Sequence, residues 1–420
     1  MRFGVFYELQ LPKPWAEGDE ERLFHEALEQ VRLADNLGFD YAWEVEHHFL
    51  EEYSHSSAPE VFLAAAAAQT KRIRVGHGIR QVIPNYNAPA RSAECIATLD
   101  IISHGRVDFG IGEGATRLEL GAFKIPAKEK RAMALEAARE IANMMVMNPY
   151  PGYEGQGFSF PCRNIVPKPV QKPHPPMWMA CTNRDTIRIA AQNGIGALAF
   201  SFVDPEEAKT WADIYYGIIK SEACVPLGHA VNANIAMVSN FSLHEDRDEA
   251  IRRGEEGFEF FRYAVNALVA QDTTPGRTRL FEDFLDIRAA KAAAGETGRT
   301  TATTGIGTPD DMRAHLAAFQ EAGVDQVIFL QQAGRNRHEH ICASLELFAA
   351  KVMQPFAAQA AEREGKKKAA LAPFIEAALA RKPRLAALAD DDIPVVKASV
   401  QRAQVPSAGV AGLEPAAAGS

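Results

Sequence analysis

The sequence predicts an α/β protein, specifically a (β/α)₈ TIM barrel with insertion segments and an Ala-rich C-terminal extension. Two observations predict this fold. Short apolar segments of strand character alternate with longer segments in which apolar residues recur at helical spacing. Eight strand segments are found, and nearly all are followed by a helix, which favours a closed barrel over the alternative, an open doubly wound sheet.

The elements follow one another with little interruption. The first predicted helix carries Phe24, Leu28 and Val31 on one face and ends at Gly38, a residue that commonly terminates helices. A later helix begins at Thr308, where an N-cap precedes a proline and two acidic residues, and ends near Gly323. The expected strands are residues 3–7, 39–45, 73–76, 106–111, 177–180, 196–200, 232–239 and 326–330. The other expected helices are residues 61–70, 89–102, 128–147, 184–192, 205–223, 245–265 and 338–356.

Three segments depart from this alternation. Residues 149–176 are rich in Pro and Gly and indicate an insertion. Residues 271–304 are polar and rich in Ala, Gly and Thr, which predicts a long mobile loop, part of it helical in the alternative, and a candidate lid over an active site. We place the barrel domain at residues 1–358 and the extension at residues 359–420, where 18 of 62 residues are Ala. Within the extension, residues 373–388 are a candidate helix, and residues 401–420 are too low in complexity to assign a structure.

Composition excludes several classes of protein. The chain of 420 residues has 45 basic and 54 acidic side chains and a formal net charge of −9, which argues against nucleic acid as a partner. The longest apolar run, residues 61–68, is far shorter than a membrane span, and we expect no membrane partner. The N-terminus has no signal-peptide pattern, and the five cysteines lack a C-x-x-C spacing. These features predict a cytoplasmic protein without a disulfide framework.

In a barrel, the residues just after each strand form the active site, so these residues are the candidates. Glu46, His47 and His48 follow the second strand, but consecutive side chains point in opposite directions, and we predict no metal site. The sequence contains no G-x-S-x-G motif, so it gives no indication of a serine hydrolase. His47 is either an acid–base group near neutral pH or a histidine satisfied within the core.

A phosphate-bearing ligand fits the other segments better. Thr182-Asn183-Arg184-Asp185-Thr186 opens a helix, where backbone N–H groups, hydroxyls and a guanidinium favour phosphate; an ordinary N-cap with a surface Arg is the alternative. Gly110-x-Gly112-x-Gly114 is a poor dinucleotide fingerprint. Its glycines are equally explained by the close approach of a ligand or of a neighbouring loop.

With these motifs, the chain resembles the bacterial luciferase family of flavin-dependent monooxygenases. The most specific segment is Gly38-Phe39-Asp40-Tyr41-Ala42-Trp43 followed by Glu46-His47-His48-Phe49. Supporting segments include Val75-Gly76-His77-Gly78, Gly105-Arg106-Val107-Asp108-Phe109-Gly110 and Gly305-Ile306-Gly307-Thr308-Pro309. The resemblance covers residues 1 to about 356 and leaves out the Ala-rich extension.

The resemblance implies a two-component monooxygenase. A separate NAD(P)H-dependent flavin reductase would supply reduced FMN, O₂ would be the co-substrate, and a flavin hydroperoxide would oxygenate a small organic substrate. His47 matches the catalytic histidine of the family, with Glu46 and His48 orienting it. Gly78 and Ile79 match the backbone that supports the flavin ring, and Thr182, Asn183 and Thr186 match the phosphate-binding turn, with Arg184 as an added candidate. A homodimer is also implied.

The chain departs from the family at one position. Where luciferase has a phosphate-binding Arg after the fourth strand, this chain has Glu113, and Arg184 or Arg117 are the candidates to compensate. Two alternatives to the monooxygenase stay open, a deazaflavin-dependent hydride-transfer oxidoreductase on the same barrel and a non-catalytic flavin-binding protein. The sequence does not select an organic substrate.

Overall fold

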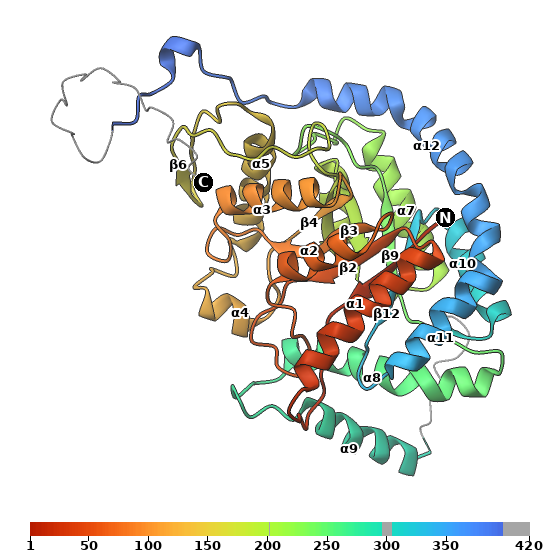
Figure 1. The fold of residues 1–420 in the computed structure, drawn as a ribbon. Helices are drawn as coiled ribbons and strands as arrows, with labels where there is room; N and C mark the ends of the chain where they lie inside the picture. Colours follow the sequence, from red (N-terminus) through yellow and green to blue (C-terminus); the bar gives the residue numbers. More distant parts are fainter. Residues whose placement is uncertain (201, 296–304, 398–420) are drawn as a thin grey trace, which may run out of the picture. The chain divides into compact units, whose positions relative to one another are not determined.

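Eight parallel strands close into a barrel in the computed structural model, which describes residues 1–200, 202–295 and 305–397 (Figure 1). Strands that follow one another along the chain are neighbours in the barrel, and the last strand pairs with the first. This arrangement confirms the predicted (β/α)₈ fold. The barrel strands are β1 (Arg2–Tyr7), β2 (Tyr41–Val45), β3 (Arg74–Gln81), β4 (Val107–Gly112), β7 (Met177–Cys181), β8 (Gly196–Ala199), β9 (Ile235–Ser239) and β12 (Gln326–Gln331).

Helices surround the barrel and bury its outer face (Figure 1). Those that follow barrel strands are α1 (Asp19–Leu37), α2 (Pro59–Gln69), α3 (Pro89–Ile102), α5 (Lys130–Val146), α6 (Arg184–Gln192), α7 (Pro205–Ile219), α10 (Pro309–Glu321) and α11 (His338–Phe348). The additional elements are α4 (Arg117–Ala122), α8 (Arg247–Ala270), α9 (Leu280–Ala293), α12 (Gln354–Arg381), the hairpin β5 (Tyr153–Glu154) with β6 (Ser159–Phe160), and the pair β10 (Ser242–Leu243) with β11 (Ile306–Gly307). The hairpin lies in the Pro- and Gly-rich segment predicted to be an insertion.

Large aromatic side chains fill part of the interior of the barrel. The rings of Trp43 and Trp178 meet edge to face with centroids 5.4 Å apart. Space for them comes from two glycines, because a Cβ atom on Gly76 would lie 2.3 Å from Trp43 and one on Gly196 would lie 2.5 Å from Trp178. The interior is therefore packed, as is usual for a barrel of eight strands.

Two expectations about the later elements need correction. The segment 271–304 holds helix α9 in its described part, so the helical alternative is confirmed there, while residues 296–304 lie outside the described residues. The helix predicted at residues 373–388 is wrong in its bounds, because α12 begins at Gln354 and ends at Arg381, with Pro373 inside it. An Ala-rich segment has little apolar periodicity to mark where a helix begins, which explains the error.

Helix α12 is tied to the N-terminal end of the barrel. The amino group of Met1 donates to the carbonyl of Phe356 (3.1 Å), and Arg2 pairs with Glu364 (2.7 Å). Further along the helix, Lys367 pairs with Asp325 (2.6 Å) just before β12. Residues Met1–Ala387 belong to one compact unit, so the boundary placed at residue 358 falls inside that unit.

One continuous helical stretch among the described residues, His338–Arg381, is long and apolar enough to cross a membrane by length and composition alone. Such a stretch is weak evidence, since core helices pass the same test. Phe348, Val352 and Met353 in its first half are buried, and the Phe348 ring packs on Phe3 with centroids 5.0 Å apart. This part of the stretch is a core helix of the barrel wall.

Candidate active site

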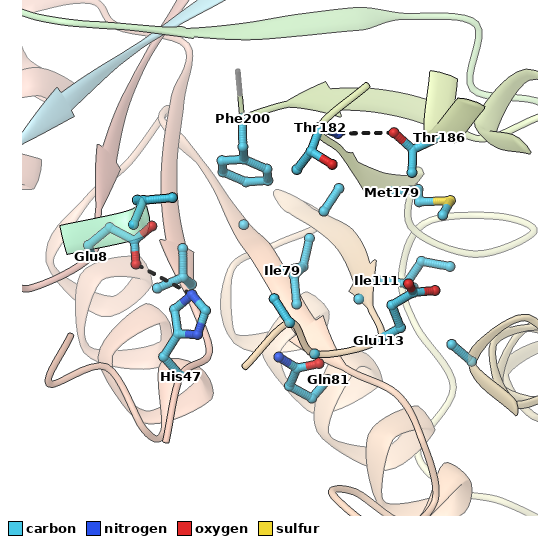
Figure 2. A pocket seen from close by; sticks show the side chains of 18 of the residues that line it. Glu8, His47, Ile79, Gln81, Ile111, Glu113, Met179, Thr182, Thr186 and Phe200 are labelled. Carbon is cyan, nitrogen blue, oxygen red and sulfur yellow. Dashed lines mark hydrogen bonds and ion pairs between the residues drawn. The ribbon is translucent and has the colours of Figure 1, made fainter. Parts of the chain in front are cut away.

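A cavity of about 570 Å³ opens at the C-terminal end of the barrel, where barrel enzymes hold their active sites (Figure 2). Its walls come from the ends of β1, β2, β3, β4, β7 and β8, from α5 and from α8. Figure 2 shows Glu8 and His47 together on one side of the cavity and Thr186 and Glu113 on the opposite side. The cavity is thus charged at both ends and apolar between them, where Ile79, Ile111 and Phe200 contribute to its wall.

His47 lies on this wall two residues after β2, between two buried carboxylates. Its Nδ1 donates to Oε1 of Glu119 (3.0 Å), and its Nε2 faces Oε2 of Glu8 (3.7 Å). Glu119 comes from α4 and also accepts from the hydroxyl of Thr116 (2.7 Å), while Tyr53 donates its hydroxyl to Glu8 (3.0 Å). The hydrogen bond at Nδ1 therefore fixes the orientation of the imidazole, and Nε2 lies within ion-pair distance of Glu8.

The two carboxylates change the acid–base behaviour of this group. Burial by itself lowers the pKa of His47, but the negative charges of Glu119 and Glu8 outweigh burial and raise the pKa to about 9. Burial raises the pKa of Glu8 to about 7, although His47 and Tyr53 partly oppose this. Burial also acts to raise the pKa of Glu119, yet His47 and Thr116 hold that pKa below its usual value. Near neutral pH the site thus keeps an imidazolium next to a carboxyl group that titrates.

The structure gives Glu46 and His48 a different task from the one expected. Glu46 accepts from His48 (3.1 Å), from the backbone N–H of Gln81 (2.9 Å) and from Asn87 (2.8 Å). Neither Glu46 nor His48 is among the residues lining the cavity. They fix the chain between β2 and β3, and Glu119 orients His47 in their place.

Gly78 and Ile79 form an irregularity in β3 that reaches the cavity. The register between β3 and β4 shifts between His77 and Arg80, so this short stretch bulges out of the regular ladder. Ile79 packs over Gly112 of β4, where a Cβ atom would lie 2.0 Å from its Cδ1. Both Gly78 and Ile79 line the cavity, and the glycines of β4 serve this close approach of a neighbouring strand.

The turn before α6 contributes less than the sequence suggested. Thr182 and Thr186 line the cavity, but Asn183 and Arg184 do not. The Thr186 hydroxyl accepts from the backbone N–H groups of Thr182 (3.0 Å) and Asn183 (3.1 Å), and the Asn183 side chain accepts from those of Asp185 and Thr186 (both 3.0 Å). The N–H groups expected to be open to phosphate are therefore largely used in a capping box.

Two cations of α5 lie beside Glu113, the residue that stands where luciferase has a phosphate-binding arginine. Lys130 and Arg131 line the cavity and both pair with Glu113, at 3.3 and 2.7 Å. Arg131 and Lys130 hold the pKa of Glu113 below its usual value although burial opposes this, so Glu113 stays ionised and the cluster carries one net positive charge. Arg184 instead pairs with Glu207 (2.5 Å), and Arg117 is exposed and absent from the lining residues.

Helix α8 covers the side of the cavity next to His47, and α9 is joined to the loop that follows His47. Phe261 of α8 packs against Tyr53 with ring centroids 5.7 Å apart, and Tyr53 in turn packs against His47 at 5.6 Å. The start of α9 is fixed to the loop after His47, because the buried carboxylate of Glu52 accepts from the backbone N–H groups of Leu280 (2.8 Å) and Phe281 (3.1 Å). The segment predicted as a lid is therefore tied, through its described residues, to the loop that follows His47.

Sequence reasoning missed Glu8, Glu119, Lys130 and Arg131. Glu8 directly follows β1 and meets the rule applied to the other strands. Thr116 and Glu119 have the spacing of a capping box before α4. Lys130 and Arg131 lie in the first turn of α5, where positive charge opposes the helix dipole and thus indicates a role in binding. Among the described residues, no group of three or more His, Cys, Asp or Glu side chains is arranged to hold a metal ion.

Comparison with known proteins identifies the family. A family model described as luciferase-like monooxygenase matches residues 1–326. The chain belongs to the luciferase-like monooxygenase family. Among curated relatives of this family, it is 31% identical over 201 residues to the oxygenase component of flavin-dependent trigonelline monooxygenase from Acinetobacter baylyi, a match that covers 46% of this chain and 52% of the relative. The chain thus spans about half the length of the curated relatives it matches first.

Solved structures of luciferase-like proteins share the fold over more of the chain. Monooxygenase RslO1 from Streptomyces bottropensis is 28% identical with a TM-score of 0.68, over 85% of this chain and all of that one. Two further structures are less than 25% identical to this chain, so their likeness shows the fold alone. The oxygenating constituent of 3,6-diketocamphane monooxygenase from Pseudomonas putida, in complex with FMN, has 20% identity, a TM-score of 0.63 and coverage of 84% and 98%. A coenzyme F420 dependent tetrahydromethanopterin reductase from Methanopyrus kandleri has 21% identity, a TM-score of 0.58 and coverage of 84% and 99%.

Proposed function

We propose that this protein is the oxygenase component of a two-component monooxygenase, which uses reduced FMN and O₂ to oxygenate a small organic substrate. The observation that carries the proposal is His47, held on the cavity wall between Glu8 and Glu119. The names of two similar proteins support it, since one is an oxygenase component and the other, which shares the fold, is described in complex with FMN. One oxygen atom enters the substrate and the other leaves as water.

The cavity residues fit FMN in three respects. The bulge of Gly78 and Ile79 offers a flat apolar surface for the flavin ring, because Gly78 has no side chain and Ile79 lies flat over Gly112. Lys130 and Arg131 supply the net positive charge that a phosphate requires. Thr182 and Thr186 contribute hydroxyl groups on the same side. Reduced FMN would supply the two electrons that activate O₂.

His47 acts as the proton donor in this proposal. Its raised pKa keeps it protonated near neutral pH, and Nδ1 is bound to Glu119, so the proton on Nε2 is the one directed along the cavity wall towards Glu8. Ionised Glu8 faces Nε2 of His47 and stabilises its protonated form. Phe200, Phe202 and Phe261 on the wall exclude water from the space next to these groups.

The family resemblance extends the proposal to the assembly. A separate NAD(P)H-dependent flavin reductase would reduce FMN, in keeping with the name of the Acinetobacter relative. A homodimer and a cytoplasmic location stay predictions of the resemblance and of the composition.

The proposal is tested by supplying the protein with FMN, NADH, a generic flavin reductase and isotope-labelled O₂, with a panel of small aromatic and aliphatic compounds. Mass spectrometry should find one labelled oxygen atom in an organic product. His47→Gln should lower product formation about 100-fold with little change in FMN affinity, because a positioned acid contributes on that order. His25→Gln, at an exposed position of α1, is the matched control. Equal loss of FMN binding and product would make His47 a structural residue.

A second arm tests the flavin site without turnover. Lys130→Gln combined with Arg131→Gln should weaken FMN binding about tenfold or more, since each charge-assisted hydrogen bond contributes about 1.5–3 kcal/mol. Binding of riboflavin, which lacks the phosphate, should change little. Arg184→Gln should leave FMN affinity unchanged, because that side chain is paired with Glu207 away from the cavity lining. A larger effect of Arg184 would restore the sequence-based assignment.

The main alternative is hydride transfer with a deazaflavin on the same barrel. The structural likeness to an F420-dependent reductase favours it, as does the paired arrangement of Glu8 and His47, which would equally serve an acid–base step. Direct comparison of FMN and F420 affinities separates the two proposals. A non-catalytic flavin-binding protein would bind FMN but give no labelled product with any compound.

A further inference from the structure

Helix α8 presents a mixed polar and apolar surface to the cavity. Phe261 and Val265 line the cavity one turn apart, and Arg262 and Asn266, which follow each of them directly, line it as well. Arg262 and Asn266 are both exposed, so they stand at the mouth, whereas Phe261 is buried beneath them. The guanidinium of Arg262 also lies over the Phe258 ring, 5.9 Å from its centroid.

Arg262 differs from the other cations of the cavity in its partners. Lys130 and Arg131 share Glu113, and His47 lies between two carboxylates. Within the part of the chain that the structure describes, no acidic side chain pairs with Arg262, and no acceptor takes a hydrogen bond from its guanidinium. Each of these other cations thus has a carboxylate partner within the protein, whereas Arg262 has none among the described residues.

The walls between Arg262 and His47 are aromatic. Phe202 packs edge to face on Phe261 at 5.8 Å, and Phe261 reaches His47 through Tyr53. A planar or apolar body can lie against these rings while its reacting part stays near His47. A guanidinium presents N–H groups in a fork that matches a carboxylate. Asn266, one turn along, donates one N–H of its amide to the backbone carbonyl of Arg262 (3.0 Å) and has a second N–H to offer as a further partner.

We propose that the organic substrate is an aromatic or similarly apolar carboxylate, whose anionic group is bound by Arg262 and Asn266 of α8. This inference rests on the proposed function for the identity of the cavity as a substrate site. It assigns α8 the role of selecting the substrate, whereas the ends of β3 and α5 hold the cofactor. Arg262 is thus a specificity residue and takes no part in the proton transfer assigned to His47.

The test compares an acid with its neutral amide, which keeps the size and shape of the ligand and removes its charge. Protein saturated with oxidised FMN, which blocks the cations of α5, is titrated calorimetrically with 2-naphthoate and with 2-naphthamide. The acid should bind about tenfold or more tightly than the amide, given the usual contribution of a charge-assisted hydrogen bond. Arg262→Gln should abolish this preference, and Arg262→Lys should restore part of it because it keeps the charge without the fork.

The matched control is Arg252→Gln, on the same helix but outside the cavity and already paired with Glu249 (2.6 Å), which should leave the preference intact. Equal binding of acid and amide, or binding of neither, would overturn the inference. The inference would also be overturned if the preference for the acid were lost on replacing Lys130 and Arg131 but kept in Arg262→Gln. If FMN itself does not bind, the proposed function fails, and the same titration of the FMN-free protein still decides whether Arg262 selects carboxylates.

Discussion

The charges around His47 depend on one another, because each group lies within reach of the next. Glu119 and Glu8 stabilise the imidazolium, and the imidazolium in turn favours the ionised form of both carboxyl groups. Groups coupled in this way release protons as a set, and their pKa values belong to the cluster. The fully charged pair of Glu8 and His47 exists above the Glu8 pKa of about 7 and below the His47 pKa of about 9.

We predict that His47 titrates near pH 9 rather than near its ordinary value of 6.5. Nuclear magnetic resonance of histidine-labelled protein measures this directly and requires no substrate. Glu119→Gln removes the nearest negative charge and should move the titration of His47 to lower pH. If the proposed function holds, activity should rise through pH 7 and fall through pH 9. A titration of the His47 signal near pH 6.5 in the unmodified protein would contradict the ion-pair arrangement.

The sequence predicted some of these site residues and missed others for a physical reason. His47 and Thr182 were found because each follows a strand, and strand ends meet at one mouth of a barrel. Gly78 follows the strand predicted at residues 73–76, although the structure places it inside β3. Glu119 and Arg131 were missed because they belong to helices whose distance from that mouth depends on the path of the intervening loops. Local pattern does not encode that path.

At the scale of elements, the close contact between β3 and β4 shapes the floor of the cavity. Gly110 of β4 lies under the bulge of β3, and a Cβ atom there would lie 2.1 Å from the backbone oxygen of His77. A backbone oxygen within a ladder cannot move aside as the end of a side chain can. The bulge at Gly78 and Ile79 is thus fitted to a glycine on the neighbouring strand.

Gly110→Ala should therefore destabilise the protein by about 1–3 kcal/mol, the usual cost of overpacking, and should weaken FMN binding by displacing the bulge. Urea unfolding measures the first effect and flavin titration the second. Gly121→Ala is the control, since a Cβ atom at this position of α4 meets nothing within 4 Å and Ala is the better helix former. Similar losses in both variants would show that β4 tolerates a side chain at Gly110.

The elements that the sequence predicted well are those with their own apolar pattern. Barrel strands are buried on both faces, so they read as short apolar runs, and all eight were predicted. The bounds differ most at β3, which runs to Gln81 although the predicted strand ends at residue 76. Helix α9 lacks such a pattern. Only Leu280, Phe281 and Phe284 are buried in it, and these pack on residues of α8 that are distant in sequence, as the 5.0 Å contact of Phe281 with Phe260 shows. Its formation depends on tertiary contacts.

At the scale of the whole compact unit, the two ends of the barrel have different tasks. The C-terminal end keeps its charges around an open cavity, whereas the N-terminal end is joined to α12 by ion pairs and hydrogen bonds. This division is general among barrels, in which one end carries activity and the other stability. The long helix that the sequence assigned to a separate extension is therefore part of what holds the barrel together.

This role of α12 predicts a contrast between two adjacent lysines. Lys367 is mostly buried and binds Asp325 (2.6 Å) and the side chain of Asn234 (2.5 Å), while Lys366 is 75% exposed and pairs only with Glu362 on the same helix. Asp325 also accepts from the backbone N–H of Ile235 (2.8 Å), so Lys367 connects α12 to both β9 and β12. Lys367→Ala should lower the free energy of unfolding by about 1–2 kcal/mol, in the range for hydrogen bonds to charged groups.

Lys366→Ala should change the free energy of unfolding by less than about 0.5 kcal/mol, as exposed pairs along one helix usually do. Urea unfolding measures both values, and hydrogen exchange at the amide of Ile235 should speed up only in Lys367→Ala, because that amide donates to the carboxylate that Lys367 holds. Equal effects of the two substitutions would mean that α12 lies on the barrel without fastening it. A larger effect at Lys367, accompanied by faster exchange in β9, would place the stability of the barrel in this contact between its last helix and two of its strands.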